Sequence, residues 1–296
     1  MIVIFRNGTG NAEVARGSCV LIIDHSHGTL MIRTTRFAIS SSACAWLFAA
    51  TVFAQTTPAA EPPKTEAKPP EPDYTLTGNF GICSQYIFRG LTQTDTKPAA
   101  QGGFDYANKN GLYVGTWLSN ISWLSDSGAC NHGCSLEWDV YGGWKYAFND
   151  DWGMDLGLYF YGYPGSYNPG VTRPDTLEVY IAGSWKWISL KYSYSVDHTF
   201  GVPDQGWYLD LTANYPLNEQ WTLVGHVGRQ EYLGNTNGVS NSVLNYTDWK
   251  LGATYSINGW SFGGYWTDTN TNGSVYTIAG KNIGKSTGTA FVQKTF

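Results

Sequence analysis

Charged residues are scarce in this 296-residue chain, because Asp, Glu, Lys and Arg together make up 14% of it, about half the share of an ordinary globular domain. Apart from one segment near the start, no run approaches the roughly 20 apolar residues of a membrane helix. A phosphate loop, a His-Glu-x-x-His motif and a dinucleotide fingerprint are also absent. The sequence therefore argues against a helical membrane protein and against an enzyme built on a known cofactor motif. We expect no cofactor and no bound metal.

Positive charge is also in short supply. The chain has 18 basic and 23 acidic residues and a net charge of −5. Residues 1–54 hold four basic and two acidic side chains, so the rest of the chain carries −7. We expect no nucleic-acid partner, because such proteins present basic surfaces. Glycine, tyrosine and tryptophan are abundant instead, with 35, 20 and 13 residues.

The first 73 residues divide into three segments. Residues 31–54 begin with the basic Arg33 and Arg36, continue with an apolar stretch and end in small residues, which is typical of a cleaved secretory signal peptide. Residues 1–30 precede its methionine and are interpreted as an upstream extension from a misplaced start. Residues 55–73 are rich in Pro and Ala and predict a flexible linker.

Residues 74–89 alternate between two faces. One face holds Leu76, Gly78, Phe80, Ile82, Ser84, Tyr86 and Phe88, and the other holds Thr77, Asn79, Gly81, Cys83, Gln85 and Arg89. Ile87 is the one apolar residue on the second, polar face. Successive side chains of a strand point to opposite sides, and a strand this long suits a tilted crossing of a bilayer, which needs roughly 9–11 residues. We predict that 74–89 is the first strand of a membrane barrel and that the last strand closes on it.

The alternation continues to the end of the chain. Further strands are predicted at 100–106, 112–121, 136–146, 152–161, 177–187, 189–196, 207–215, 221–230, 246–257, 260–267 and 288–296. Short connections, such as the Asn258-Gly259 hairpin turn, alternate with long loops rich in Gly, Asn, Ser and Thr. Residues 74–296 therefore predict a twelve-stranded antiparallel transmembrane β-barrel with short periplasmic turns and longer extracellular loops.

Tryptophans gather near both ends of the predicted strands, as in the aromatic girdles of outer-membrane barrels. This pattern predicts an outer-membrane location, with membrane lipid around the barrel. The competing fold is a secreted soluble β-barrel whose aliphatic face turns inward around a ligand. The chain ends in a strand at Phe296, and this terminal aromatic resembles the signal that barrel-assembly machinery recognises, although Lys294 stands where that signal prefers an apolar residue.

Three stretches resemble one family. They are Tyr86-x-Phe88-Arg89-Gly90-x-x-Gln93-Thr94, Pro98-Ala99-x-Gln101-Gly102-Gly103-Phe104-Asp105-Tyr106 and Gly111-x-Tyr113-x-Gly115-Thr116-Trp117-x-Ser119-Asn120. Together with the Gly280-Lys281-x-x-Gly284-Lys285 stretch and the Lys-Thr-Phe ending, they are similar to the TorF-type porin family of Gram-negative bacteria. The resemblance covers about 74–296 and implies an outer-membrane location and a channel. Cys130-x-x-x-Cys134 is a departure from that family.

Cys130 and Cys134 flank His132 in a predicted outer loop. A zinc site would need a fourth ligand that is not apparent nearby. In an oxidising compartment a local disulfide is the simpler interpretation, provided that the two Cα atoms come within about 7 Å. Cys83 is then left as a small buried residue.

The polar face of the strands is predicted to line a bore. Its charged members are Arg89, Asp105, Glu137, Asp139, Lys145, Asp155, Glu178, Lys186, Lys191, Asp210 and Lys250. So many charges in a dry interior would be very costly, so we predict a narrow, water-filled pore for small hydrophilic solutes. With the loop residues Asp126, Asp175 and Asp204, it should prefer cations weakly. Arg89 fits either a selectivity charge or an ion pair with an acid such as Asp105.

Three classes of function follow. A passive porin-like channel is the first, and a structural or surface-interaction barrel with a plugged lumen is the second. The third is an outer-membrane lipid-modifying enzyme, with His198 as the base on the outer wall. No serine shares the outer face of His198 at its height, and a nucleophile needs its base within hydrogen-bond reach, so we predict no catalytic residues. The oligomeric state is left open.

Overall fold

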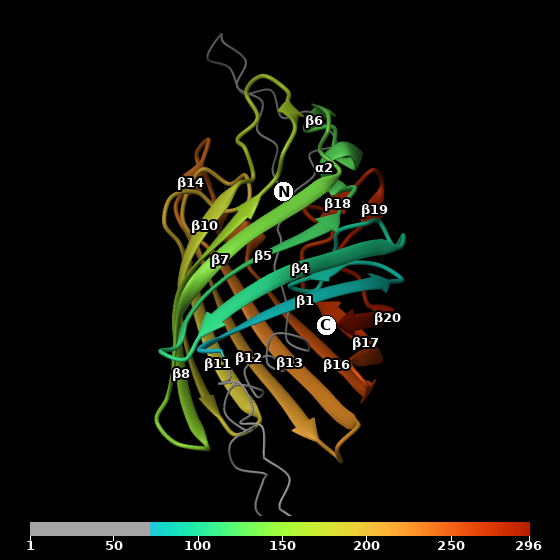
Figure 1. Cartoon of the computed structure of the whole chain (residues 1–296). Helices are drawn as coiled ribbons and strands as arrows, with labels where there is room; N and C mark the ends of the chain where they lie inside the picture. Colours follow the sequence, from blue (N-terminus) through green and yellow to red (C-terminus); the bar gives the residue numbers. More distant parts are fainter. Residues whose placement is uncertain (1–71) are drawn as a thin grey trace, which may run out of the picture.

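The computed structural model describes residues 72–296. The predicted upstream extension (1–30), the signal peptide (31–54) and all but the end of the linker (55–73) lie outside the described residues. From Tyr74 onward the chain forms one barrel of long tilted strands, with loops gathered at one end (Figure 1).

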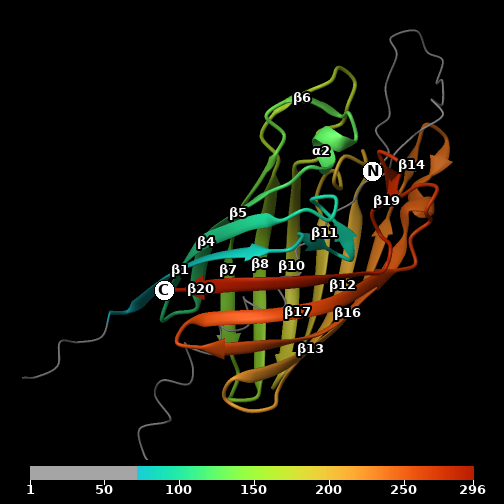
Figure 2. The ribbon, with the colours of Figure 1, turned by 90° about the vertical axis from the view of Figure 1, so that its right-hand side faces the viewer.

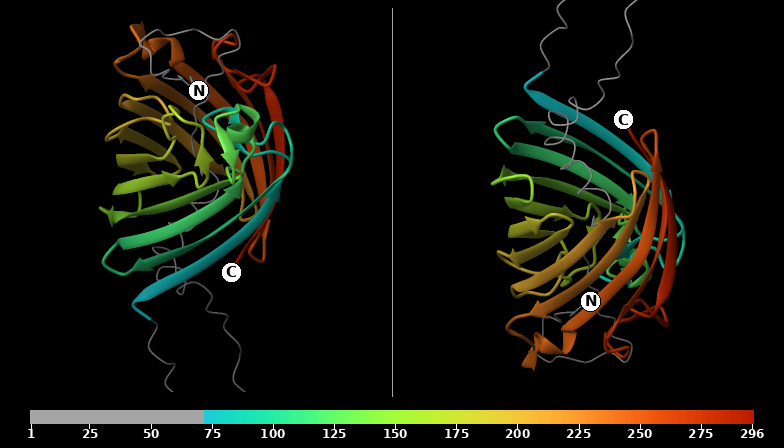
Figure 3. Two further views of the ribbon diagram at one scale, coloured as in Figure 1. Left: turned by 90° about the horizontal axis from the view of Figure 1, so that it is seen from above. Right: turned by 90° about the horizontal axis from the view of Figure 1, so that it is seen from below.

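Twelve strands close into a single antiparallel barrel, which confirms the predicted strand number and fold class. The strands are β1 (Tyr74–Cys83), β4 (Ala99–Asn108), β5 (Leu112–Asn120), β7 (Leu136–Ala147), β8 (Trp152–Gly162), β10 (Thr176–Trp185), β11 (Ile188–Ser195), β12 (Gly206–Pro216), β13 (Trp221–Tyr232), β16 (Tyr246–Ile257), β17 (Trp260–Thr269) and β20 (Thr287–Thr295). Each pairs with its neighbour in sequence, and the ring of strands is visible from both ends of the barrel (Figure 3).

The first and last strands close the ring, as the sequence predicts. β1 pairs with β20 from Asn79 opposite Thr295 to Cys83 opposite Phe291, and the two strands lie side by side in Figure 2. Gly78 and Phe296 add reciprocal backbone hydrogen bonds of 2.8 and 3.0 Å at the end of this seam. Closure leaves no free sheet edge, which a barrel in lipid requires because lipid cannot satisfy exposed backbone groups.

Short turns and long loops lie at opposite ends of the barrel. The long loops carry small elements: β2 (Ile87–Phe88), β3 (Leu91–Thr92), α2 (Trp123–Asp126), β6 (Cys130–His132), β9 (Ser166–Tyr167), β14 (Asn235–Thr236), β15 (Val239–Ser240), η2 (Asn241–Leu244), β18 (Thr277–Ile278) and β19 (Lys281–Asn282). Trp123, Leu124 and Tyr276 are buried among these loops. The loops therefore pack against one another and over the end of the barrel.

The outer surface of the barrel is apolar. Leu76 is 67% exposed and Leu251 is 64% exposed, and similarly exposed aliphatic and aromatic side chains occur on every barrel strand except β20. Phe296, directly after β20, is 66% exposed. An apolar belt of this extent in water would far exceed the patches that soluble monomers expose, so the aliphatic face is turned toward lipid rather than inward around a ligand. Among residues 72–296, no helix has the length and apolar character to cross a bilayer.

Candidate functional site: the bore and its inward-folded plug

One long loop does not stay outside the barrel. The predicted strand 74–89 ends at Cys83, and residues 85–94, called the plug below, turn into the bore as a hairpin of β2 and β3. Ile87 and Phe88 are both buried, at 5% and 0% exposure, which neighbouring residues of a two-faced wall strand cannot achieve. The prediction of one continuous strand through Arg89 is therefore wrong, and Ile87 on the polar face was the local sign of the break.

The tip of the plug is a two-residue turn formed by Arg89 and Gly90. Their φ angles are 40° and 83°, the left-handed pair that a tight hairpin turn requires. A Cβ on Gly90 would collide with side-chain atoms of Asp248 and Thr269. Position 90 therefore requires glycine for two reasons, the left-handed backbone conformation and the close approach of the plug to the wall.

Arg89 reaches the far side of the bore. Its guanidinium makes a two-pronged contact with Glu178 on β10, with Nη1–Oε1 and Nη2–Oε2 distances of 3.1 and 2.9 Å, and it donates to Gln230 on β13 at 2.8 Å. The guanidinium carbon also lies 4.1 Å from the ring centroid of Tyr208 on β12. Four strands separate β1 from β10 around one side of the ring, and three separate β1 from β13 around the other. The plug therefore spans the bore.

A second contact of the plug is with an acidic pair on β7. The Tyr86 hydroxyl donates to Glu137 at 3.0 Å, and the Tyr159 hydroxyl donates to Asp139 at 3.0 Å. Both carboxylates are fully buried. Burial raises the pKa of Tyr86 well above its usual value, and the neighbouring charges of Glu137 and Asp139 raise it further. The Tyr86 hydroxyl thus stays protonated and remains a donor to Glu137.

A histidine lies between two acids beside the plug. The His226 ring is 2.9 Å from Asp248 through Nε2 and 3.3 Å from Asp210 through Nδ1. Tyr208, on which Arg89 stacks, donates to Asp248 at 2.9 Å. Asp248 is absent from the predicted bore residues, although it alternates with Lys250 on β16 and that parity could have found it.

Toward the short turns the bore is less tightly packed. The Lys145 ammonium lies 3.8 Å from Asp155 and 4.4 Å from the ring centroid of Tyr113, and the Lys191 ammonium lies 4.0 Å from the ring centroid of Tyr180. The side chains of Lys145 and Asp155 are 29% and 25% exposed. These charges are half-buried, in contrast to the fully buried Glu178 beside the plug.

The structure places most predicted bore residues on the inner face of wall strands. These are Asp105, Glu137, Asp139, Lys145, Asp155, Glu178, Lys191, Asp210 and Lys250. Arg89 projects from the plug and pairs with Glu178, whereas Asp105 accepts from Tyr141 at 2.7 Å. Lys186 departs from its predicted position, because it lies in the exposed turn after β10 with its ammonium 3.7 Å from Asp151. A turn residue has no inward face.

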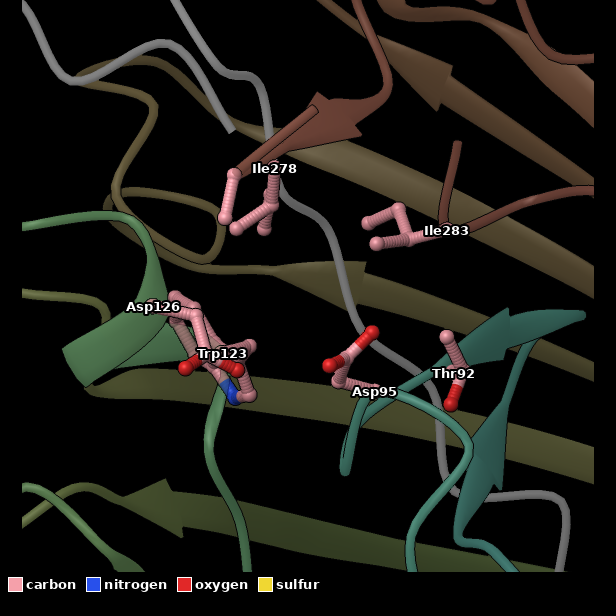
Figure 4. A pocket seen from close by; sticks show the side chains of 7 residues that line it. Thr92, Asp95, Trp123, Asp126, Ile278 and Ile283 are labelled. Carbon is pink, nitrogen blue, oxygen red and sulfur yellow. The ribbon is translucent and has the colours of Figure 1, made fainter. Parts of the chain in front are cut away.

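Three loops meet over the plug at a small pocket. It is lined by Thr92 and Asp95 from the first long loop, Trp123 and Asp126 from α2, and Ile278, Ala279 and Ile283 from the last long loop (Figure 4). The Thr92 amide donates to the Ile283 carbonyl at 2.9 Å. Partial burial alone would raise the pKa of Asp95, but hydrogen bonds from Lys281 and Lys97 and their charges outweigh it and lower the pKa.

A disulfide joins Cys130 to Cys134, whose Cα atoms are 6.3 Å apart, and Cys83 is free and buried. With both sulfurs in the disulfide, they are not available as thiolate ligands. Within residues 72–296 no group of three or more His, Cys, Asp or Glu could hold a metal ion. His198 lies in the loop after β11, with Nδ1 3.1 Å from Asp197.

A closed barrel with an apolar outer belt and a polar bore defines a transmembrane β-barrel, here with a plug inside it. Residues 66–296 match the family described as bacterial protein of unknown function (Gcw_chp), and the chain belongs to that family. The match does not name the TorF type, so that resemblance stays a prediction. A search of curated proteins gave no match.

Several solved outer-membrane barrels are similar in structure. The KdgM porin has a TM-score of 0.46 and 10% identity, and it covers 74% of this chain and 99% of its own. The NanC porin has a TM-score of 0.48 and 11% identity, with 75% and 99% covered. The COG4313 outer membrane channel from Pseudomonas putida F1 has a TM-score of 0.49 and 11% identity, and the match covers 80% of this chain and 100% of that channel.

Proposed function

We propose that this protein is an outer-membrane, porin-like channel for passive diffusion of small hydrophilic solutes, closed by its plug in the conformation described. The main support for this proposal is the set of contacts that hold the plug in the bore. Its backbone hydrogen bonds go to itself and to other loops, as from Gln93 to Tyr86 and from Thr92 to Ile283, while its wall contacts are made by side chains such as Arg89. The plug can leave without unzipping a wall strand.

The wall supports a water-filled bore once the plug moves. A twelve-stranded barrel has a wider interior than an eight-stranded one, which side chains alone can fill. Its interior is narrower than that of the large general porins. Half-buried charges such as Lys145 and Asp155 are best accommodated by water. The predicted solutes are therefore small and polar.

Cation preference is the finer part of the proposal. The inward acids Asp105, Glu137, Asp139, Asp155, Glu178, Asp210 and Asp248 outnumber the bases Arg89, Lys145, Lys191 and Lys250. An excess of fixed negative charge concentrates cations in a pore. In planar bilayers under a KCl gradient, the reversal potential should favour K⁺ and should weaken as the Debye length falls toward about 3 Å at 1 M. Anion preference would contradict this part.

Liposome swelling with sugars and amino acids of graded size tests the channel. Wild-type protein should admit solutes slowly, and a variant with residues 86–93 replaced by a short Gly-Ser linker should admit them faster up to a size limit. Solute flux that is equal and negligible in both, with the variant folded, would favour the second candidate, a structural or surface-interaction barrel. The complete burial of Phe88, Leu91 and Gln93 in the bore is the observation that supports that alternative.

The remaining predictions concern location and partners. We also propose export by the signal peptide, outer-membrane residence and recognition of β20 by barrel-assembly machinery, because β20 is the strand that closes the barrel on β1. Fractionation of cells that express the chain tests the location. The enzyme hypothesis receives no support from His198, whose Nδ1 lies 3.1 Å from the carboxylate of the adjacent Asp197.

A further inference from the structure

The tip of the plug carries a guanidinium. Three wall strands and the loop after β11 form a site around it that is suited to that group. This guanidinium seat consists of Glu178, Gln230, Tyr208 and Phe200. Glu178 accepts from both terminal nitrogens of Arg89, Gln230 accepts at 2.8 Å, and the Tyr208 and Phe200 ring centroids lie 4.1 and 5.5 Å from the guanidinium carbon. A carboxylate, an amide oxygen and two aromatic rings bind a planar cation through paired hydrogen bonds and cation–π contact.

We infer that the guanidinium seat is a binding site for solutes that carry a guanidinium group, with Arg89 as its built-in occupant. This inference rests on the proposed channel and names a solute class for it. A guanidinium solute that replaces Arg89 in the seat releases the tip of the plug, so binding and opening are one exchange.

The reason lies in the burial of Glu178, which is 1% exposed. If the plug left alone, this carboxylate would lose its counter-charge in a buried position, and breaking a buried pair from one side is strongly unfavourable. A solute guanidinium that takes the place of Arg89 in the seat supplies Glu178 with a new counter-charge. An ammonium compensates the charge but cannot reproduce the planar two-pronged contact with the carboxylate, so it is the weaker competitor.

The loops provide an approach for a cation. The pocket over the plug is lined by the carboxylates of Asp95 and Asp126, and its wall includes Thr92 of the plug itself (Figure 4). Lys281 and Lys97 contact Asp95 at 2.6 and 3.3 Å and offset its charge. Asp126 is therefore the acid of this pocket that attracts a cation. A cation in the pocket therefore lies against the segment that must move.

Arg89 competes as a tethered group. A short flexible tether gives an effective concentration in the millimolar range, and the further contacts of the plug strengthen the competition. Free guanidinium compounds should therefore act weakly on the wild type. Removal of the Arg89 side chain vacates the seat and should make it accessible to them.

The test measures the unfolding temperature of the purified full barrel in detergent. Methylguanidinium is the probe and methylammonium is the matched control, each at roughly 10 mM, which exceeds the millimolar effective concentration of a tethered group. Arg89→Ala should be stabilised by methylguanidinium more than by methylammonium. The apparent affinity of Arg89→Ala for methylguanidinium should exceed that of Arg89→Ala/Glu178→Gln by about tenfold or more, which corresponds to roughly 1.4 kcal/mol. The wild type should respond least.

Equal shifts with the two cations, or a difference that survives in the double variant, would overturn the inference. If Arg89→Ala refolds poorly, its refolding yield becomes the readout, and methylguanidinium but not methylammonium should restore it. Failure to restore it also counts against the seat. These readouts need no conductance, so a folded Arg89→Ala that binds methylguanidinium but passes no ions would refute the channel and keep the site.

Discussion

The bore has two regions whose charged residues share a wall but not an environment. Near the loops, Arg89 and Glu178 are each 1% exposed and are held together by the plug. Near the short turns, Lys145 and Asp155 are each about a quarter exposed, with a longer contact of 3.8 Å. Glu178, Lys145 and Asp155 share the same inward alternation of strand residues. The sequence pattern also assigned Arg89 to that face, so the pattern alone does not separate the two pairs.

The difference indicates that burial by the plug, more than position on the wall, decides how strongly a charged pair contributes to stability. A buried pair is strongly destabilised when one partner is removed, because the other stays desolvated. A pair that water can reach, such as Lys145 and Asp155, is partly screened and contributes less. In the proposed channel, the loop end would keep the bore closed, and the turn end would adjust ion preference once it is open.

Glu178→Gln should have the largest effect. It leaves the Arg89 guanidinium buried beside a neutral amide, and loss of one partner of a buried pair costs roughly 3–5 kcal/mol. We expect the plug to leave its seat, so single-channel conductance in planar bilayers should rise. Glu219→Gln, at an exposed residue of a short turn, is the control and should leave conductance unchanged. A closed Glu178→Gln channel would show that Arg89 does not hold the plug.

Gly90→Ala should have the next largest effect. The new methyl group meets Asp248 and Thr269 at a φ of 83°, and strained left-handed backbone costs about 1–3 kcal/mol even before the collision. Conductance should rise as in Glu178→Gln, but less. Gly238→Ala is the matched control, because its φ is 79° with open space around the new methyl group. Equal behaviour of the two variants would mean that the close approach of the tip is unimportant.

The wall was predictable from the sequence because strand alternation and lipid exposure act locally. Lys145, Asp155 and Glu178 alternate with apolar neighbours such as Leu156 and Val179, and the structure places them on the inner face. The prediction for Lys186 was wrong because alternation does not mark where a strand ends. The chain turns one residue earlier than predicted, so Lys186 lies in the turn. These errors are confined to strand ends.

The plug could not be predicted in the same way. Its place depends on contacts between residues far apart in the sequence, such as Arg89 with Glu178 and with Gln230. Alternation within 74–89 continues through the break with only Ile87 out of pattern. The Arg-Gly turn is compatible with a long loop outside the barrel or with a hairpin inside it, and tertiary packing selects between them.

Lys145→Ala tests the other side of the comparison and should have a smaller effect. Loss of this half-exposed contact with Asp155 should cost at most about 1 kcal/mol, so the unfolding temperature should barely change. In a channel opened by Glu178→Gln, the loss of one positive charge should shift the reversal potential further toward cations. Lys285→Ala, in an exposed loop, is the control. A large stability loss would mean that the turn end is as dry as the loop end.

The smallest effect should come from acid titration of Asp95, which ties the plug loop to the last long loop through a 2.6 Å contact with Lys281. Its pKa is lowered from 3.8 in the folded protein. The stabilisation is therefore complete above the unfolded pKa and is lost as pH falls through the lower, folded value.

Because Lys281 and Lys97 are mostly exposed, the contribution of these pairs should be below about 1 kcal/mol and weaker in high salt. The component of the single-channel open fraction that depends on Asp95 should be flat between pH 5 and 7, which lie above the ordinary aspartate range, and should rise only below 3.8. Other buried carboxylates titrate in acid as well, so the comparison is with Asp95→Asn, which should open slightly more at neutral pH and lack this component of the acid rise. If both proteins respond to acid identically, the tie between Asp95 and Lys281 does not hold the plug, and its other contacts, such as those with Glu178 and Glu137, do.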